Sequence, residues 1–121
     1  MPKSYTTTVF NGPIEGTAVI NTDPSLNEML GRADYLVVQV KVVGAVTGTT
    51  NVVVNYEHSN NNVDWKLATA TPLVNAPVAG GANEIASTGD ARLAAYGRFE
   101  ISLTGATPGA SVEVIACGRT E

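Results

Sequence analysis

The chain has 121 residues, of which 44% are hydrophobic and 15% charged, and its net charge is -4 at pH 7. This length and hydrophobic content predict one globular domain with a sizeable core and exclude an intrinsically disordered chain. The negative charge argues against nucleic acid as a partner, because binding to phosphates needs a basic face. The single cysteine, Cys117, excludes an internal disulfide and a zinc site of several thiolates, and we expect it to be a small buried residue.

The N-terminal residues predict a short arm over 1–4, followed by a single domain over 5–121. The arm lacks the apolar segment of a secretory signal. No apolar run approaches the roughly 20 residues that cross a bilayer. We therefore expect a protein that is made in a cytoplasm and has no membrane among its partners.

The first part of the chain predicts a short hairpin and a brief helix. Residues 5–10 are β-prone, and the Asn-Gly-Pro triplet at 11–13 is a strong turn signal ahead of a second strand over 14–20. Ser25 is placed to cap a helix near residues 25–30, with a glutamate at the third helical position as in a capping box.

The stretch 35–58 predicts the longest feature of the chain, a β-hairpin. Hydrophobic side chains alternate over residues 35–43, which indicates a strand with one buried face. The glycine-bounded segment 44–48 supplies a turn, and the alternation resumes over 51–57. We expect the two strands to pair with each other.

A polar loop follows, and the chain then predicts shorter strands. Val63, Trp65 and Leu67 alternate and are expected to point inward. Residues 69–82 contain two prolines and two adjacent glycines, which favours an edge strand and a loop because proline cannot donate to a central ladder. A further short strand is expected over 83–88.

A second predicted hairpin over 96–117 repeats features of the first. Tyr96 corresponds to Tyr35 and Gly105 corresponds to Gly44 at the same offset. We interpret this as two similar hairpins in the two halves of the chain. The residues expected to point inward from the first strand of this hairpin are Phe99, Ile101 and Leu103.

Short strands separated by turn signals, without alternating helices, predict an all-β fold. We expect an antiparallel β-sandwich, jelly-roll-like, with about eight strands and at most one short helix near residues 25–30. The two hairpins would form the centres of two facing sheets, with Trp65 and Phe99 as the large core residues.

The sequence contains no arrangement typical of catalysis. His58 is the only histidine, and its neighbour Glu57 would point to the opposite face of the same strand. A nucleophile, a base and an orienting group cannot be assembled from one cysteine and one histidine in separate strands. We expect an exposed histidine at a strand end, no enzyme activity and no cofactor.

The polar loop after the first long hairpin offers a candidate metal site. Asn60, Asn61, Asn62 and Asp64 could offer oxygen ligands to calcium, but one carboxylate is little charge for such a site and a plain turn is favoured, so no metal is expected.

Aromatic residues could form a sugar platform if several lay on one outer face. The candidates are Tyr35, Tyr56, Trp65 and Tyr96. Tyr56 and Trp65 share the parity of their apolar neighbours, which favours packing in the core.

One stretch resembles a known family. The pattern Val52-x-Val54-x-x-Glu57-x-Ser59-x-Asn-Asn-x-x-Trp65 resembles a strand-loop-strand in small β-sandwich structural proteins of tailed bacteriophages. The segment 97–105, Gly-Arg-Phe-Glu-Ile-Ser-Leu-Thr-Gly, is similar to a second strand of the same proteins. Together these cover about half of the chain.

The resemblance implies a capsid decoration (cement) protein or another virion structural protein. Its partners would then be the major capsid protein or other virion subunits, it would form a homo-oligomer, with a trimer favoured, and it would be made in the host cytoplasm and located in the virion. A carbohydrate- or surface-binding β-sandwich module is the alternative. The residues expected to contact partners are Pro2, Lys3, Ser4, Tyr5, Asn60, Asn61, Asn62, Pro72 and Pro77.

Overall fold

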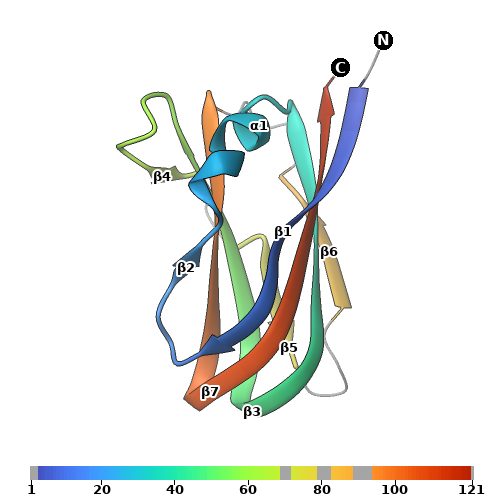
Figure 1. Ribbon diagram of the computed structural model, residues 1–121, viewed down its shortest axis with the longest axis vertical. Coiled ribbons are helices and arrows are strands. Elements are labelled where there is room, and N and C mark those ends of the chain that lie inside the picture. The colour runs from blue at the N-terminus through green and yellow to red at the C-terminus, as the bar shows by residue number, and fades with distance from the viewer. Residues whose placement is uncertain (1–2, 69–71, 79–82, 89–93, 121) are drawn as a thin grey trace.

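The computed structural model describes residues 3–68, 72–78, 83–88 and 94–120, which form one seven-stranded antiparallel sheet with a short helix (Figure 1). The elements are β1 (Lys3–Glu15), β2 (Ile20–Asn21), the 3-10 turn η1 (Pro24–Leu26), α1 (Asn27–Gly31), β3 (Tyr35–Ser59), β4 (Lys66–Leu67), β5 (Val74–Pro77), β6 (Asn83–Ser87) and β7 (Tyr96–Thr120). The predicted all-β class with one short helix is confirmed. Within the described residues, no helix is long and apolar enough to cross a bilayer.

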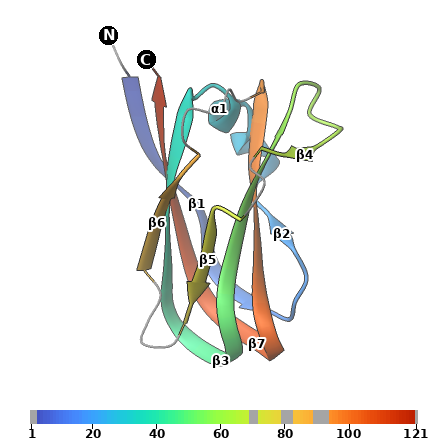
Figure 2. The same ribbon diagram turned by 180° about the vertical axis from the view of Figure 1, so that it is seen from behind.

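The sheet is organised around β3 and β7, which have 25 residues each and pair antiparallel from end to end. Tyr35 pairs with Arg119 at one end of the ladder and Ser59 pairs with Tyr96 at the other. Both strands bend back on themselves near their midpoints (Figures 1 and 2), where the register shifts repeatedly between Val42 and Asn51. Each strand therefore has two arms on opposite sides of the core.

The predicted pairing within each hairpin is wrong. The chain does reverse at 44–48, but the first arm of β3 pairs with the second arm of β7, and the second arm of β3 pairs with the first arm of β7. The bend is possible because Gly48 adopts φ +58, and a Cβ there would collide with the carbonyl of Ala106. Alternation identifies the buried face of a strand but not its neighbour, so the same pattern fits both pairings.

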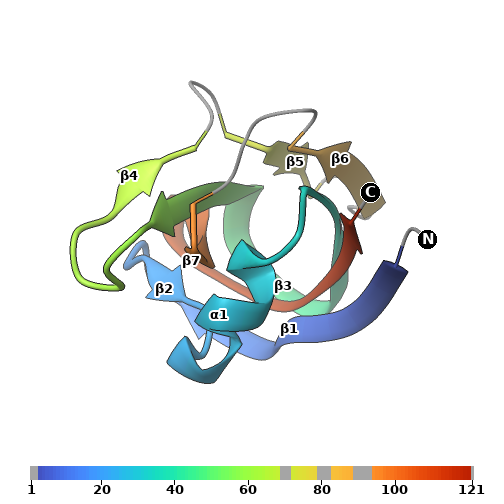
Figure 3. The same ribbon diagram turned by 90° about the horizontal axis from the view of Figure 1, so that it is seen from above.

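The shorter strands extend the two sides of this bent pair. β1 and β2 pair with the second and first arms of β7, while β6 and β5 pair with the first and second arms of β3. The sheet curls strongly into a half-barrel around one core, and α1 lies over its open end (Figure 3). This is a correction to the predicted jelly-roll-like sandwich of two separate sheets and about eight strands.

The core lies inside the curl and draws on both arms of both long strands. Tyr56 and Phe99 are fully buried, with ring centroids 5.1 Å apart and planes tilted by 57°. Leu30 of α1 closes the open end and is also fully buried. The predicted inward residues of β7 are confirmed as Phe99, Ile101 and Leu103.

The N-terminal elements differ from the prediction. The Asn-Gly-Pro triplet at 11–13 lies inside β1, and the chain turns later, at Gly16 with φ +80. β1 begins at Lys3, within the predicted arm 1–4, and its ladder with β7 starts at the same residue. The helical segment is capped by Asp23, whose carboxylate accepts the backbone N–H of Ser25, and not by Ser25 itself.

Four side chains expected to be buried are not. Val63 is 74% exposed and Leu67 is 48% exposed, while Trp65 is only half-buried and outside the core. β4 is only two residues long, so its alternation has no sheet interior to face. Cys117 is half-buried, because Ala116 takes the inward position beside it on β7.

The strands predicted near the two prolines are present. β5 ends at Pro77 and pairs with residues 51–54 of β3, as expected for an edge strand, and β6 lies within the predicted 83–88. The rest of the stretch, 69–71 and 79–82, lies outside the described residues.

Candidate functional site

Among the described residues, three uncharged segments meet at the end of the molecule opposite α1, and we call them the uncharged tip: residues 16–19, 43–50 and 104–110. The two bends and the turn after β1 meet here (Figures 1 and 2). The backbone N–H of Gly16 donates to the carbonyl of Pro108 at 2.8 Å, which joins the first segment to the third.

Valines are exposed on the uncharged tip, and hydrogen bonds join its second and third segments. Val19, Val43 and Val46 are 54%, 53% and 45% exposed. Beneath them the buried hydroxyl of Thr49 donates to the carbonyl of Gly109 at 2.9 Å and accepts the N–H of Gly109 at 3.0 Å. The tip thus presents exposed valines among exposed threonines, and its three segments carry no charge, while the exposed Glu15 pairs with Gly109 at its edge. Sequence reasoning assigned these segments to turns and strands and did not foresee that they meet.

A second surface lies on the outer face of the sheet, nearer α1. Tyr96, Arg98 and Glu100 alternate along β7, with Phe99 and Ile101 buried on the other side. The ladder places Glu57 opposite Arg98 and Asn55 opposite Glu100. We call this the acid–aromatic face, and its members are Asn55, Glu57, Trp65, Tyr96, Arg98 and Glu100.

Arg98 is the centre of the acid–aromatic face. Its Nε donates to Oε1 of Glu57 at 2.8 Å, with both side chains largely covered. Its guanidinium carbon lies 4.3 Å from the ring centroid of Trp65, within cation–π range. Partial burial, and next the negative charge of Glu57, raise the pKa of the Glu100 carboxyl, while Arg98 opposes them. Within this face, two carboxylates thus share one guanidinium.

The loop after β3 uses its polar groups to hold itself. Oδ1 of Asn61 accepts the hydroxyl of Ser59 and the backbone N–H groups of Val63 and Asp64, all at 2.9–3.0 Å. Nδ2 of Asn61 donates to the Asp64 carboxylate at 2.9 Å. This is the self-satisfied turn favoured in the sequence analysis over a calcium site.

The neighbouring asparagines connect the loop to the rest of the fold. Oδ1 of Asn60 accepts the N–H of Ala95 at 3.2 Å, and Oδ1 of Asn62 accepts Nδ2 of Asn27 at 2.9 Å. Among the described residues, no three histidine, cysteine or carboxylate side chains gather where they could hold a metal ion. All three asparagine side chains thus have structural roles. The expected contacts of Asn60, Asn61 and Asn62 with a partner stay predictions.

The other predicted contact residues lie at two places. The hydroxyl of Tyr5 donates to the carbonyl of Met29 at 3.0 Å, which ties β1 to α1. Lys3 and Ser4 lie in the same strand, and Pro2 lies outside the described residues. Pro72 and Pro77 are both exposed, and Pro77 is the last residue of the short strand β5, which Pro72 precedes.

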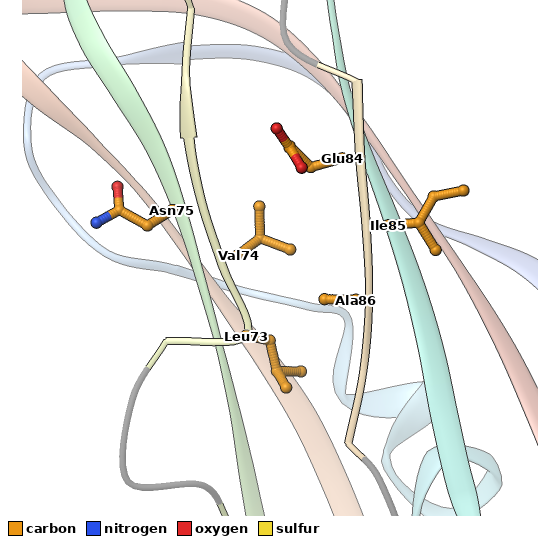
Figure 4. A pocket seen from close by; sticks show the side chains of 6 residues that line it. All are labelled: Leu73, Val74, Asn75, Glu84, Ile85 and Ala86. Carbon is orange, nitrogen blue, oxygen red and sulfur yellow. The ribbon is translucent and has the colours of Figure 1, made fainter.

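A shallow groove of about 160 Å³ lies between β5 and β6. Figure 4 shows Val74 and Ala86 turned into it together with the carboxylate of Glu84, while Asn75 and Ile85 point away on either side. The groove is smaller than the usual range of about 300–1,000 Å³ for small-molecule sites. An inward-facing charge on an edge strand is a common protection against unwanted pairing, and Glu84 fits that role.

His58 is half-buried, and not exposed at the strand end as expected. Its Nδ1 accepts the backbone N–H of Ala94 at 3.3 Å, so this nitrogen is engaged in fixing the start of β7.

Neither a protein-family model nor a curated protein sequence matches the chain. Among solved structures, the chain is similar to the PBSX exported protein XepA, with a TM-score of 0.60, 18% identity and coverage of 97% of this chain and 38% of that one. It is also similar to the SPBc2 prophage-derived protein YomS, with a TM-score of 0.53, 17% identity and coverage of 99% and 96%. The chain thus spans well under half of XepA but almost all of YomS. At these identities the likeness establishes the fold: the chain shares a strongly curled β-fold with two prophage-encoded proteins.

Proposed function

We propose that the chain is a non-enzymatic structural protein of a bacteriophage particle, which decorates and stabilises a capsid shell as a cement protein. The observation that carries the proposal is the uncharged tip with its three projecting valines. The prophage origin of XepA and YomS supports the same setting, as does the resemblance of the Val52–Trp65 pattern to phage structural proteins.

The tip has the properties of a docking surface. Each valine of the tip loses exposed apolar area on contact. At about 25 cal/mol per Å², this contributes roughly 1 kcal/mol per valine to the free energy of binding. The three segments contain no charge that has to be desolvated, and the carboxylate of Glu15, which pairs with Gly109, lies at their edge. The base held by Thr49 is already ordered, so little conformational entropy is lost on binding.

A single tip of this size gives a weak contact, so shell binding requires several tips acting together. Linked copies raise the overall affinity without new contacts. A homo-oligomer, with a trimer favoured, meets this need and places equivalent tips on equivalent shell subunits.

The composition of the tip favours a protein partner over a membrane. Surfaces that bind bilayers combine apolar residues with lysines, arginines or aromatic residues at the interface. The three segments of the tip contain none of these. The partner we propose is therefore the major capsid protein or another virion subunit.

The test is co-sedimentation of the purified protein with expanded capsid shells of the phage or prophage that encodes it. We expect saturable binding by the wild type and at least tenfold weaker binding by the double variant Val43→Ser/Val46→Ser. The matched control is Val63→Ser, which removes an exposed valine far from the tip and is expected to bind like the wild type.

Two results would contradict the proposal. The first is that the wild type does not sediment with shells, whether it binds nothing or binds phosphatidylcholine–phosphatidylglycerol vesicles instead of shells. The second is wild-type binding by the double variant. Thermal denaturation of each variant establishes that its fold is retained.

A further inference from the structure

We propose that the acid–aromatic face is a second binding site, which takes a saccharide chain without acidic groups. This goes beyond the role in a capsid shell, and it rests on residues that the uncharged tip does not include. Three features carry the inference: a fixed aromatic platform, a grid of planar polar groups, and the charge of the face.

The first feature is the aromatic platform. Saccharides pack the C–H face of a ring against an aromatic side chain, and a ring that is already fixed loses little entropy on binding. Trp65 is half-buried, and the guanidinium of Arg98 covers part of its ring at 4.3 Å from the centroid, so a saccharide would pack on the area of the ring that stays exposed. Tyr96 lies two residues before Arg98 on the same face of β7 and is also half-buried.

The second feature is the set of planar polar groups beside these rings. Arg98 and Glu57 are locked together by their 2.8 Å hydrogen bond, and Glu100 lies opposite Asn55 in the next outward row of the ladder. Paired strands lie about 4.8 Å apart, so Asn55 and Glu100, which lie opposite each other, can reach adjacent hydroxyls of one sugar ring. Glu57 and Arg98 are largely covered and serve mainly to hold Trp65. Carboxylate, amide and guanidinium groups can each make two hydrogen bonds in one plane.

The third feature is charge, which restricts the class of saccharide. Two carboxylates share one guanidinium in this face, which leaves an excess of negative charge. A uronic acid would bring a like charge against Glu57 and Glu100 and bind poorly. Neutral and amino sugars meet no such repulsion.

The location of the face allows both sites to be used together. Glu57 and Arg98 lie in the halves of β3 and β7 nearer to α1, and the uncharged tip is at the other end of the molecule (Figure 1). A copy docked by its tip therefore presents the acid–aromatic face away from the shell.

The experiment uses Trp65, the single tryptophan of the chain, as an intrinsic probe of the site. Its fluorescence is followed during titration with cellohexaose, chitohexaose, xylohexaose and the hexamer of glucosamine, and with the hexamer of galacturonic acid as the acidic arm. We expect at least one of the first four to change the emission saturably and the galacturonic acid hexamer to bind at least tenfold more weakly.

Variants are compared by isothermal titration calorimetry with the oligosaccharide that binds the wild type most tightly. We expect Trp65→Ala to weaken binding at least tenfold and Trp65→Tyr to restore most of it. The matched control is Tyr35→Ala, which removes an aromatic ring at the other end of the β3–β7 ladder and is expected to leave binding unchanged.

The proposal is overturned if none of the neutral or amino hexasaccharides changes Trp65 emission, if the galacturonic acid hexamer binds best, or if Trp65→Ala binds as tightly as the wild type. The shell test separates the two sites. Trp65→Ala is expected to sediment with shells like the wild type even where its saccharide binding is lost.

Discussion

Gly97 lies directly against the phenol ring of Tyr56, so close that a Cβ on residue 97 would be 2.6 Å from the Cζ of Tyr56. Tyr56 is fully buried, and its hydroxyl donates to the carbonyl of Leu30 at 3.4 Å. One side chain of β3 thus contacts β7 and α1, and the missing side chain of Gly97 makes room for it.

The first prediction concerns this close approach. Gly97→Ala should lower the free energy of unfolding by about 1–3 kcal/mol, because the fully buried ring of Tyr56 has no free space to move into. The measurement is urea denaturation. The control is Gly12→Ala, where the nearest atom to the new Cβ is 4.0 Å away on Phe10, and a change within about 0.5 kcal/mol is expected. Equal effects of the two substitutions would contradict the packing described.

The second prediction concerns alkaline pH. Burial, and next the nearby Tyr5, raise the pKa of the Tyr56 phenol well above its ordinary value of 10.0. The folded state therefore keeps this proton when the unfolded state loses it. The stabilisation is fully present below pH 10 and is lost as the pH rises towards the folded pKa, by up to about 1.4 kcal/mol per pH unit.

Tyr56→Phe tests this, because phenylalanine has no proton to lose. The free energy of unfolding, measured by urea denaturation from pH 8 to pH 11, should fall less steeply above pH 10 in the variant than in the wild type. At pH 8 the variant should be less stable by about 1 kcal/mol, since the Leu30 carbonyl loses its donor. Identical slopes in the two proteins would show that Tyr56 does not carry the effect.

Much of the fold could be read from periodicity, and the error came from pairing. The buried positions of β7 follow from strict alternation, and Phe99, Ile101 and Leu103 are all in the core. The glycines at 44 and 48 signal a reversal, which is present. Whether the two arms then pair with each other or with another bent strand depends on contacts between residues far apart in the chain, which a local pattern does not contain.

The candidate surfaces were less accessible to prediction for the same reason. The contact between Arg98 and Trp65 requires the register of β7 against β3 and the path of the loop after β3. The uncharged tip requires three distant segments to meet. Parity with its apolar neighbours alone placed Trp65 in the core, although Trp65 lies just before β4, whose two residues offer no buried face.

The third prediction concerns the acid–aromatic face. Partial burial and Glu57 raise the pKa of Glu100 above its ordinary value of 4.5, so the folded state holds this proton more tightly than the unfolded state. The resulting stabilisation is fully present below pH 4.5, the ordinary pKa, and is lost as the pH rises through the higher pKa of the folded state. At neutral pH the ionised carboxylate is therefore destabilising.

Glu100→Gln should raise Tm at pH 7, and the gain should disappear near pH 4. The measurement is differential scanning calorimetry across this range. Glu113→Gln is the control, since Glu113 lies opposite Lys41 in the ladder and has a favourable charge beside it. It should not raise Tm at pH 7. A gain for both variants would point to the net charge of the chain and not to the local environment of Glu100.

The fourth prediction concerns the loop that positions Trp65. Asn61→Ala removes the acceptor of three hydrogen bonds, from Ser59, Val63 and Asp64. Because the loop is exposed, water replaces part of what is lost, and the expected cost is about 1 kcal/mol, similar to loss of a helix cap. Backbone amides of residues 61–64 should exchange faster with solvent.

Asn75→Ala is the matched control, because Asn75 is also exposed but accepts a single hydrogen bond, from Nδ2 of Asn51 at 2.8 Å. It should change stability by less than about 0.5 kcal/mol and leave the loop amides unaffected. Trp65 follows the loop directly, so Asn61→Ala should also shift its fluorescence emission. Unchanged exchange and emission in Asn61→Ala would mean that the loop holds Trp65 by backbone contacts alone, and that the acid–aromatic face does not depend on the asparagine turn.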